Sequence, residues 1–471
     1  MHAAFLPWER ADRALLGAAA EVPMVMAALV SWVLAATAAL IAGCSGSDET
    51  SGSSGASGSD GTGASSGDPG SASGGSGGSG GSADGSGSAS GGSGGSGGSN
   101  IQPVPGCDAD DPSLSDAERA LVEMPADSWW SAPNTPFFAV CDTPAHEPLH
   151  ASSGCGAVIT AWSGGAWDPD RGQMLVFGGG HNDYWGNELY GFDVATMSWK
   201  ILVEASTGLT VDNQNKDPLD DGTPVSRHTY DGVQYLGGPH RFFSFGGAMS
   251  ANGYATTVTW TLDIENGTWQ NMQPGGEGTP FNGANGTYWM ATAYDPVTDR
   301  VFYKSEAGFS IYDVGANTWS RVLDGGYPPL YPDFSDTRYR RGVLDSKRRL
   351  FFAFGEKPET QVFVWNIDEA ADVSADWKSS GGEAVFAMSA FGVDYDPSAD
   401  AMVAWGGGTP WVLDLASKTW TAKSGEGAPA AQVDTGTYGR FRYIPRYNVF
   451  VLVNEPDEDV RFYKHSAGCG E

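Results

Sequence analysis

Basic residues are scarce in this sequence, where 26 Lys and Arg stand against 57 Asp and Glu and leave a net charge of −31 over 471 residues. A field of that sign repels polyphosphates, so we expect no nucleic-acid partner and no attraction to an anionic lipid surface. Cysteine is also rare, and none of the five forms a Cys-x-x-Cys pair, which argues against a structural zinc site. We therefore predict neither a metal nor another cofactor.

Bulky apolar residues are absent from Ser45 to Asn100, a segment that consists almost entirely of Gly and Ser. Such a segment cannot bury enough surface to offset the entropy of ordering, so residues 44–100 are predicted to be a disordered linker that begins with Cys44. Residues 1–43 then form a signal segment and residues 101–471 form the folded domain. That domain is long enough, and rich enough in Trp and other apolar residues, for a large core.

One long apolar run, residues 22–43, precedes the linker. It ends in Leu-Ile-Ala-Gly-Cys at residues 40–44, which resembles the lipobox of bacterial lipoproteins. The resemblance implies that Cys44 becomes a lipidated N-terminus, and Ser45 after it resembles lipoproteins that are sorted to an outer membrane. We therefore expect an exported protein, anchored by lipid to the bacterial cell envelope, with its folded domain in the periplasm or outside the cell.

Two features of this N-terminal region leave alternatives open. A run of about 20 apolar residues also suffices to span a bilayer, so it can instead be an uncleaved membrane helix. The segment before it is long and contains Glu9, Asp12 and Glu21 rather than being short and basic, so translation can also begin at Met24 or Met26. Either way, the folded domain is exported and tethered to a membrane.

Four cysteines remain once Cys44 is lipidated: Cys107, Cys141, Cys155 and Cys469. An even number in an oxidising compartment predicts two disulfides. Of the three possible pairings we favour Cys141 with Cys155 and Cys107 with Cys469, because the second bridge would join the two ends of the domain.

A pattern recurs along the folded domain. An apolar run ends in Gly-Gly, a polar loop follows, an alternating strand closes with Asp, and a Trp comes a few residues later. The clearest copies are residues 174–179 with 189–193 and Trp199, and residues 242–247 with 261–263 and Trp269; weaker copies begin at Val301, Leu350, Ala401 and Tyr438. Six units of about 45 residues result, with turn dipeptides such as Asp168-Pro169 between strands.

These residues resemble the kelch repeat and, by extension, the central propeller of the galactose oxidase family. The resemblance covers roughly residues 160–465 and implies an all-β, kelch-like β-propeller of six four-stranded blades, or seven if residues 141–162 form a blade. The last copy has three strands, so we expect residues 128–131 to supply the fourth strand and close the ring. The glycine pair would let a strand meet the next loop without a side chain between them, and the Trp would pack between neighbouring blades.

The blade topology indicates where a site would lie. The loop from the second to the third strand of a blade and the loop that enters the next blade open on the same face, where propellers generally bind ligands. The loops of residues 181–187 and 226–230 should therefore be neighbours at this mouth. The predicted site residues on these and later loops are His181, Asp183, Tyr184, Trp185, Arg227, His228, Tyr230, Tyr288, Trp289, Arg338, Arg340 and Arg440. Positive charge is thus expected to gather at one mouth of an acidic body.

Aromatic rings beside Arg and His suit a carbohydrate, because rings stack on sugar faces and guanidinium groups bind carboxylate or sulfate. We therefore predict that the mouth binds an envelope or extracellular glycan, or a protein partner. Each residue also has a structural interpretation, in which His181 and Asp183 cap a turn and the arginines pair with nearby acids.

Two enzymatic alternatives remain. The domain resembles propeller polysaccharide lyases, which would make His181, Arg227, His228 and Tyr230 catalytic: a base takes the proton α to a uronate carboxylate, and Arg neutralises that carboxylate. A copper oxidase like galactose oxidase is less well supported, because the chain has no Tyr-His dipeptide and we expect no further domain after the ring. His146 and His150 have a spacing that suits a metal on a helix, but Pro144 and Pro148 favour a loop.

Overall fold

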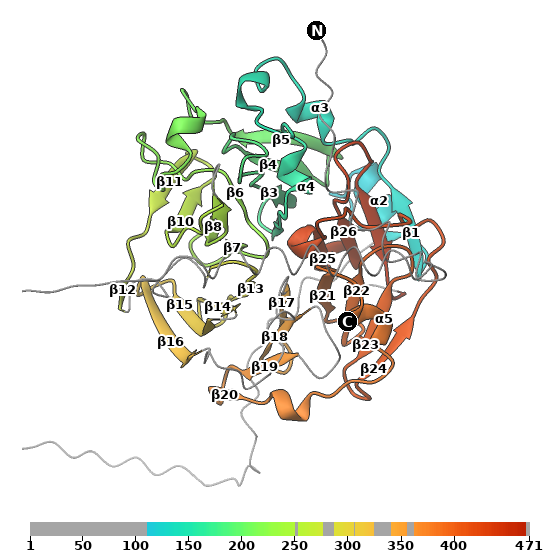
Figure 1. Cartoon of the computed structure of the whole chain (residues 1–471). Helices are drawn as coiled ribbons and strands as arrows, with labels where there is room; N and C mark the ends of the chain where they lie inside the picture. The colour runs from blue at the N-terminus through green and yellow to red at the C-terminus, as the bar shows by residue number, and fades with distance from the viewer. Residues whose placement is uncertain are drawn as a thin grey trace, which may run out of the picture. The chain divides into compact units, whose positions relative to one another are not determined.

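The computed structural model describes residues 111–249, 253–276, 287–305, 307–324, 341–355 and 362–467. In this part of the chain, six antiparallel sheets form the blades of a β-propeller arranged in a ring (Figure 1). The all-β, six-bladed prediction is therefore confirmed. The signal segment, the linker, Cys44, Cys107 and Cys469 lie outside the described residues. None of the described helices has the length and apolarity that crossing a membrane requires.

Each blade contains four antiparallel strands in chain order, except that the sixth takes its outer strand from the start of the domain. The third blade also has an extra parallel strand, β12 (Gly275–Gly276). The strands of each blade follow from the inner to the outer edge. Blades one to three are, in turn, β2 (Gly165–Asp168), β3 (Gln173–Val176), β4 (Leu189–Asp193) and β5 (Ser198–Val203); β7 (Val233–Leu236), β8 (Arg241–Phe245), β10 (Thr259–Asp263) and β11 (Thr268–Asn271); and β13 (Ala291–Asp295), β14 (Arg300–Ser305), β15 (Gly308–Asp313) and β16 (Thr318–Asp324). Blades four to six are β17 (Arg341–Asp345), β18 (Leu350–Phe354), β19 (Phe363–Asn366) and β20 (Ala371–Asp372); β21 (Gly392–Asp396), β22 (Ala401–Trp405), β23 (Trp411–Asp414) and β24 (Thr419–Ala422); and β25 (Phe441–Ile444), β26 (Val449–Leu452), β27 (Arg461–Lys464) and β1 (Ser128–Ser131).

Short elements decorate this ring. A two-stranded ribbon pairs β6 (Arg227–His228), which precedes the second blade in the chain, with β9 (Ala248–Met249), which follows β8 within that blade. The helices are α2 (Asp116–Val122), α3 (Phe138–Cys141), α4 (Ala157–Thr160) and α5 (Glu383–Phe386), with single 3-10 turns at η2 (Glu147–Leu149), η3 (Val211–Asn213), η6 (Ser374–Asp376), η7 (Tyr438–Arg440) and η8 (Pro445–Tyr447).

The N-terminal strand closes the ring, as predicted. β1 pairs antiparallel with β27, with Ser128 opposite Lys464 and Ser131 opposite Arg461. Trp129 on β1 stacks on Tyr463 with ring centroids 4.9 Å apart. The seven-bladed alternative is wrong, because residues 141–162 form parts of α3, η2 and α4 instead of a sheet.

The glycine pairs and tryptophans have the packing roles expected from the repeat. Gly246 and Gly247 have φ values of 75° and 98°, and the Gly247 N–H donates to the carbonyl of Thr287 in the next entering loop at 2.8 Å. A Cβ on Gly247 would also collide with the carbonyl of His228. Trp269 packs against Phe177 of the preceding blade at 5.3 Å between centroids, so it fills the space between two blades.

Aspartates end four of the inner strands and shape the turn that follows. Asp168, Asp295, Asp345 and Asp396 are buried, and each carboxylate accepts hydrogen bonds from backbone N–H groups two and three residues further on. Such a side-chain cap satisfies the backbone of a tight turn. The Asp-Pro dipeptides recognised in the sequence are therefore the first turns of their blades.

The six inner strands contact one another in sequence around the axis of the ring. A set of polar side chains, which we name the axial network, joins them; all are buried except the partly exposed Asp394, and they are Asp231, Gln234, Thr292, Arg341, Asp394 and Arg442. Asp231 precedes β7, yet its Oδ2 accepts from the N–H groups of Thr292 and Gly342 on β13 and β17, both at 2.8 Å. Gly342 is required here, because a Cβ would collide with the backbone of Thr292. Hydrogen bonds between side chains and backbone of different blades thus cross the axis.

Candidate functional site

The two loops that the sequence placed together do meet at the mouth. His228 donates from Nε2 to Asp183 Oδ2 at 3.0 Å, which joins the loop entering the second blade to the loop between β3 and β4. The rings of His181 and Trp162 lie 5.1 and 4.9 Å from the His228 ring. Four side chains from two adjacent blades therefore form one cluster.

Backbone conformation exposes His181 above this cluster. His181 and Asn182 both have left-handed φ values, 57° and 68°, which turn the chain sharply after the glycines that follow β3. Asp183 is held from the other side, where its Oδ1 accepts from Ser153 Oγ at 2.9 Å. The segment that carries Ser153 is anchored by the predicted disulfide between Cys141 and Cys155. The covalent bridge therefore supports the loop that orients His228.

Burial decides the charge of His228. Its side chain is 2% exposed, and the loss of hydration lowers its pKa even though the Asp183 carboxylate opposes the shift. A neutral imidazole that donates to Asp183 is a hydrogen-bonding group of fixed orientation. His228 therefore fixes the Asp183 carboxylate, whose side chain is 24% exposed, at the mouth.

Partly exposed aromatic rings continue the mouth toward the third blade. We name Trp162, Tyr254, Tyr288 and Trp289 the aromatic arc; Tyr254 is 61% exposed, and the other three are half-buried. Tyr288 donates from Oη to the carbonyl of Gly253 at 2.6 Å, and a Cβ on Gly253 would approach the His181 ring to 2.6 Å. The arc and the histidine cluster are therefore continuous.

Trp162 was missed by the sequence analysis, although a signal existed. Four blades have an aromatic residue at the same place, seven residues before the turn that follows the inner strand: Trp162, Tyr230, Trp289 and Tyr438. All four have φ between 45° and 48°. Tyr230 is 5% exposed and lies 6.4 Å from Trp289 and 5.9 Å from Tyr438, between ring centroids. Aligning the repeats on these turns would have shown a column of aromatic residues around the mouth.

Besides His228 and Tyr230, which are buried at the mouth, three predicted site residues lie in the interior, where they bind other parts of the protein. Arg227 is fully buried and pairs with the buried Asp217 at 3.0 Å. Arg440 is fully buried and donates to the carbonyls of Ser163 at 2.9 Å and Asn454 at 3.0 Å, and burial lowers its pKa to about 10. The expected collection of exposed arginines is thus not seen in the described residues, because these two guanidinium groups hold loops together; Arg338 and Arg340 lie outside those residues.

Tyr184 is the third, and it belongs to a buried group beneath the mouth loop. It donates from Oη to Glu188 Oε1 at 2.7 Å, and His146 Nε2 lies 3.6 Å from the same oxygen. Burial raises the pKa of Glu188 to about 7 and lowers that of His146. His146 and His150 flank η2, so one helical turn forms where a loop was expected. Trp185 is half-buried beside this group, and its backbone N–H donates to the carbonyl of Leu149.

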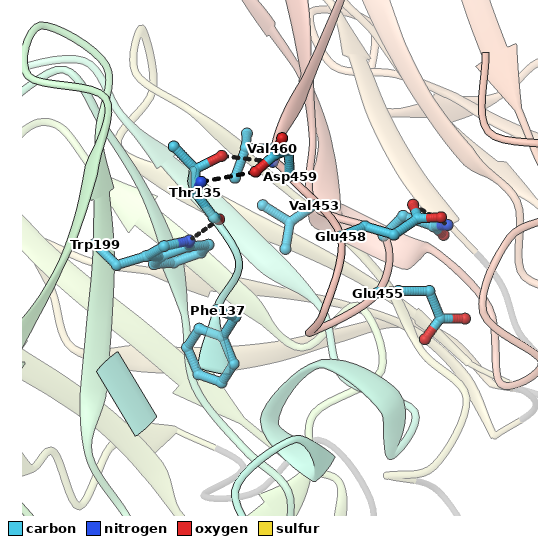
Figure 2. Close-up of a pocket in the computed structure, with 9 residues that line it drawn as sticks. Thr135, Phe137, Trp199, Val453, Glu455, Glu458, Asp459 and Val460 are labelled. Carbon is cyan, nitrogen blue, oxygen red and sulfur yellow. Dashed lines mark hydrogen bonds between the residues drawn. The ribbon is translucent and has the colours of Figure 1, made fainter. Parts of the chain in front are cut away.

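A shallow surface hollow, without enclosed space for a water molecule, lies between the first and last blades (Figure 2). Its wall includes Phe137 and Trp199 together with Glu455, Glu458 and Asp459. Asp459 accepts from the N–H of Thr135 at 2.7 Å, and Glu458 accepts from Asn454, so two of the three carboxylates have protein partners. None of the predicted site residues lines this hollow.

No three His, Cys, Asp or Glu side chains come together as metal ligands anywhere in the described ranges. No known family model matches the chain, and no curated protein matches it. Among solved structures, a fungal alcohol oxidase of the AA5 family, in complex with copper, matches with a TM-score of 0.40 and 12% sequence identity. The match covers 64% of this chain and 62% of that enzyme, less than two thirds of its length.

The chain folds as a six-bladed, kelch-like propeller. The glycine pairs, the inter-blade tryptophans and the N-terminal closing strand of its blades show this architecture.

Proposed function

We propose that the mouth of the propeller binds a carbohydrate without chemical turnover. The observation that carries this proposal is the aromatic arc beside the His181, Asp183 and His228 cluster. Flat, partly exposed rings offer apolar faces to a sugar, and neighbouring fixed polar groups bond its hydroxyls. The four rings and the histidine cluster come from the first three blades, so their spacing is held by the rigid ring.

The charges at the mouth favour a neutral sugar over a uronate. Arg227, which a lyase would use to neutralise a carboxylate, is turned away and paired with Asp217. His228 and Asp183 have the geometry of a base and its orienting carboxylate. Without a cation beside them among the described residues, however, this pair better supports ligand orientation than proton abstraction.

Tyr254→Ala is expected to weaken binding of a neutral oligosaccharide roughly tenfold, because a ring that stacks on a sugar contributes about 1.5 kcal/mol. The oligosaccharide is first selected on a glycan array, and its affinity is then measured by titration calorimetry. Val297→Ala removes an apolar side chain that is 76% exposed in the β13–β14 turn, at the far end of the blade from the mouth. Equal affinities of both variants and the wild type would contradict the proposal.

We also propose that the protein is displayed on the cell envelope through lipidated Cys44, as residues 40–44 imply. The intact mass of detergent-extracted protein is expected to correspond to a chain that begins at Cys44 and carries acyl groups. A mass that includes residues 1–43 would instead identify an uncleaved membrane helix.

A further inference from the structure

Arg341 in the axial network has an unusual set of partners. Its side chain is 1% exposed, and its Nη1 donates to Asp231 Oδ1 and to the carbonyl of Gly342. Its Nε and Nη2 atoms are buried and have no hydrogen-bond partner among the described residues. Nε–H and Nη2–H point from the same edge of the guanidinium group, so they form a complete two-donor fork.

The nearby carboxylates do not serve this fork. Asp231 is already bonded by Arg341 Nη1 and by two backbone N–H groups. Asp394 lies 4.0 Å from Arg442, and its side chain is 19% exposed. The one buried carboxylate of the network is therefore fully used, while two charged N–H groups of Arg341 still need an acceptor.

A second guanidinium group increases the positive potential there. Arg442 on β25 is 8% exposed and donates to the carbonyls of Gly165 and Gly439 at 3.2 and 3.1 Å. Burial lowers its pKa to about 10, and repulsion from Arg341 acts in the same direction. A buried charged donor without an acceptor is costly, so this arrangement favours an acceptor that carries negative charge.

We propose that a small monovalent anion binds on the propeller axis, accepting from Nε–H and Nη2–H of Arg341. Arg341 is fully buried between inner strands, so the site suits an ion of the size of chloride or formate and excludes a saccharide. The fork binds a halide and the two oxygens of a carboxylate through the same two donors. This site is separate from the carbohydrate site proposed above.

The test uses the wild-type protein. Crystals grown in sodium bromide are expected to show an anomalous bromine peak within hydrogen-bond distance of Arg341 Nε and Nη2. The melting temperature is expected to rise with the logarithm of bromide, chloride or formate concentration, compared with gluconate at equal ionic strength. The more strongly stabilising arm, halide or formate, identifies the preferred anion. A water without anomalous signal and equal melting temperatures in all salts would overturn the proposal.

A matched pair of variants separates the fork from general charge effects. Arg341→Lys keeps the charge and loses the fork, so the anion dependence of the melting temperature should disappear. Arg349 precedes β18 of the same blade and has its three nitrogens bonded to Asp295 and Asp368. Arg349→Lys should therefore lower the melting temperature and keep the anion dependence. If Arg341→Lys does not fold, the wild-type bromide crystal decides.

Discussion

Asp231→Ala is expected to lower the free energy of unfolding by about 3–5 kcal/mol, the range found when one partner of a buried ion pair is removed. Asp231 is 1% exposed, and its carboxylate bonds Arg341, Thr292 and Gly342 across three blades. Its loss leaves a buried guanidinium and two backbone N–H groups without their acceptor. Urea unfolding followed by tryptophan fluorescence measures the change.

Two further variants interpret that result. Asp231→Asn keeps the size of the side chain and removes its charge, so a similar loss would assign the cost to charge compensation. Asp457→Ala changes an exposed aspartate in the last blade and should alter stability by less than about 0.5 kcal/mol. An Asp231→Ala protein as stable as Asp457→Ala would show that the axial network does not hold the blades together.

The second large effect is a pH dependence of the free energy of unfolding, which originates at Glu188. Burial raises its pKa from 4.5 to about 7 in the folded protein, so the folded state binds this proton more tightly than the unfolded state does. The resulting stability is present below about pH 4.5 and is lost as the pH rises through about 7. The loss amounts to about 3 kcal/mol. Glu188→Gln mimics the protonated form, so it should be more stable than the wild type by about that amount at pH 8.

Carboxylates with a lowered pKa make the protein less stable at low pH, which is opposite to the effect of Glu188. The informative quantity is therefore the difference in unfolding free energy between variant and wild type at each pH. Asp400, for example, has its pKa lowered by hydrogen bonds from Arg348. The groups that face Glu188 are Tyr184, Tyr190, His146 and the exposed Glu204. Glu204→Gln is the control, and its stability should follow the wild-type pH profile closely. A difference in unfolding free energy between Glu188→Gln and the wild type that stays constant from pH 5 to pH 8 would contradict this assignment.

The blades could be predicted from the sequence because each repeat contains the residues that form its own turns. The aspartate at the end of an inner strand caps its own turn. The glycine pair and the inter-blade Trp contact only the same or a neighbouring blade, so each repeat needs no more distant partner. Ring closure by residues 128–131 also followed, because a blade of three strands leaves an edge that needs a partner.

Side-chain direction at the mouth was harder to predict. Arg227 and His228 are consecutive on β6, so one turns inward to Asp217 and the other reaches Asp183. Asp183 and Tyr184 are also consecutive, and their side chains point in different directions: Asp183 bonds His228, and Tyr184 bonds Glu188. The topology predicted correctly which loops meet. Whether a side chain points inward depends on partners such as Asp217, and these lie on segments without a repeat pattern.

The pairing of β1 with β27 has a consequence for how the molecule is assembled. The two strands are separated by more than 300 residues, so blade six remains a three-stranded sheet until the earliest strand returns to it. During that interval β27 offers unpaired backbone groups along a free edge. At high concentration, an incomplete ring can accept the corresponding strand from another copy, which yields strand-swapped dimers.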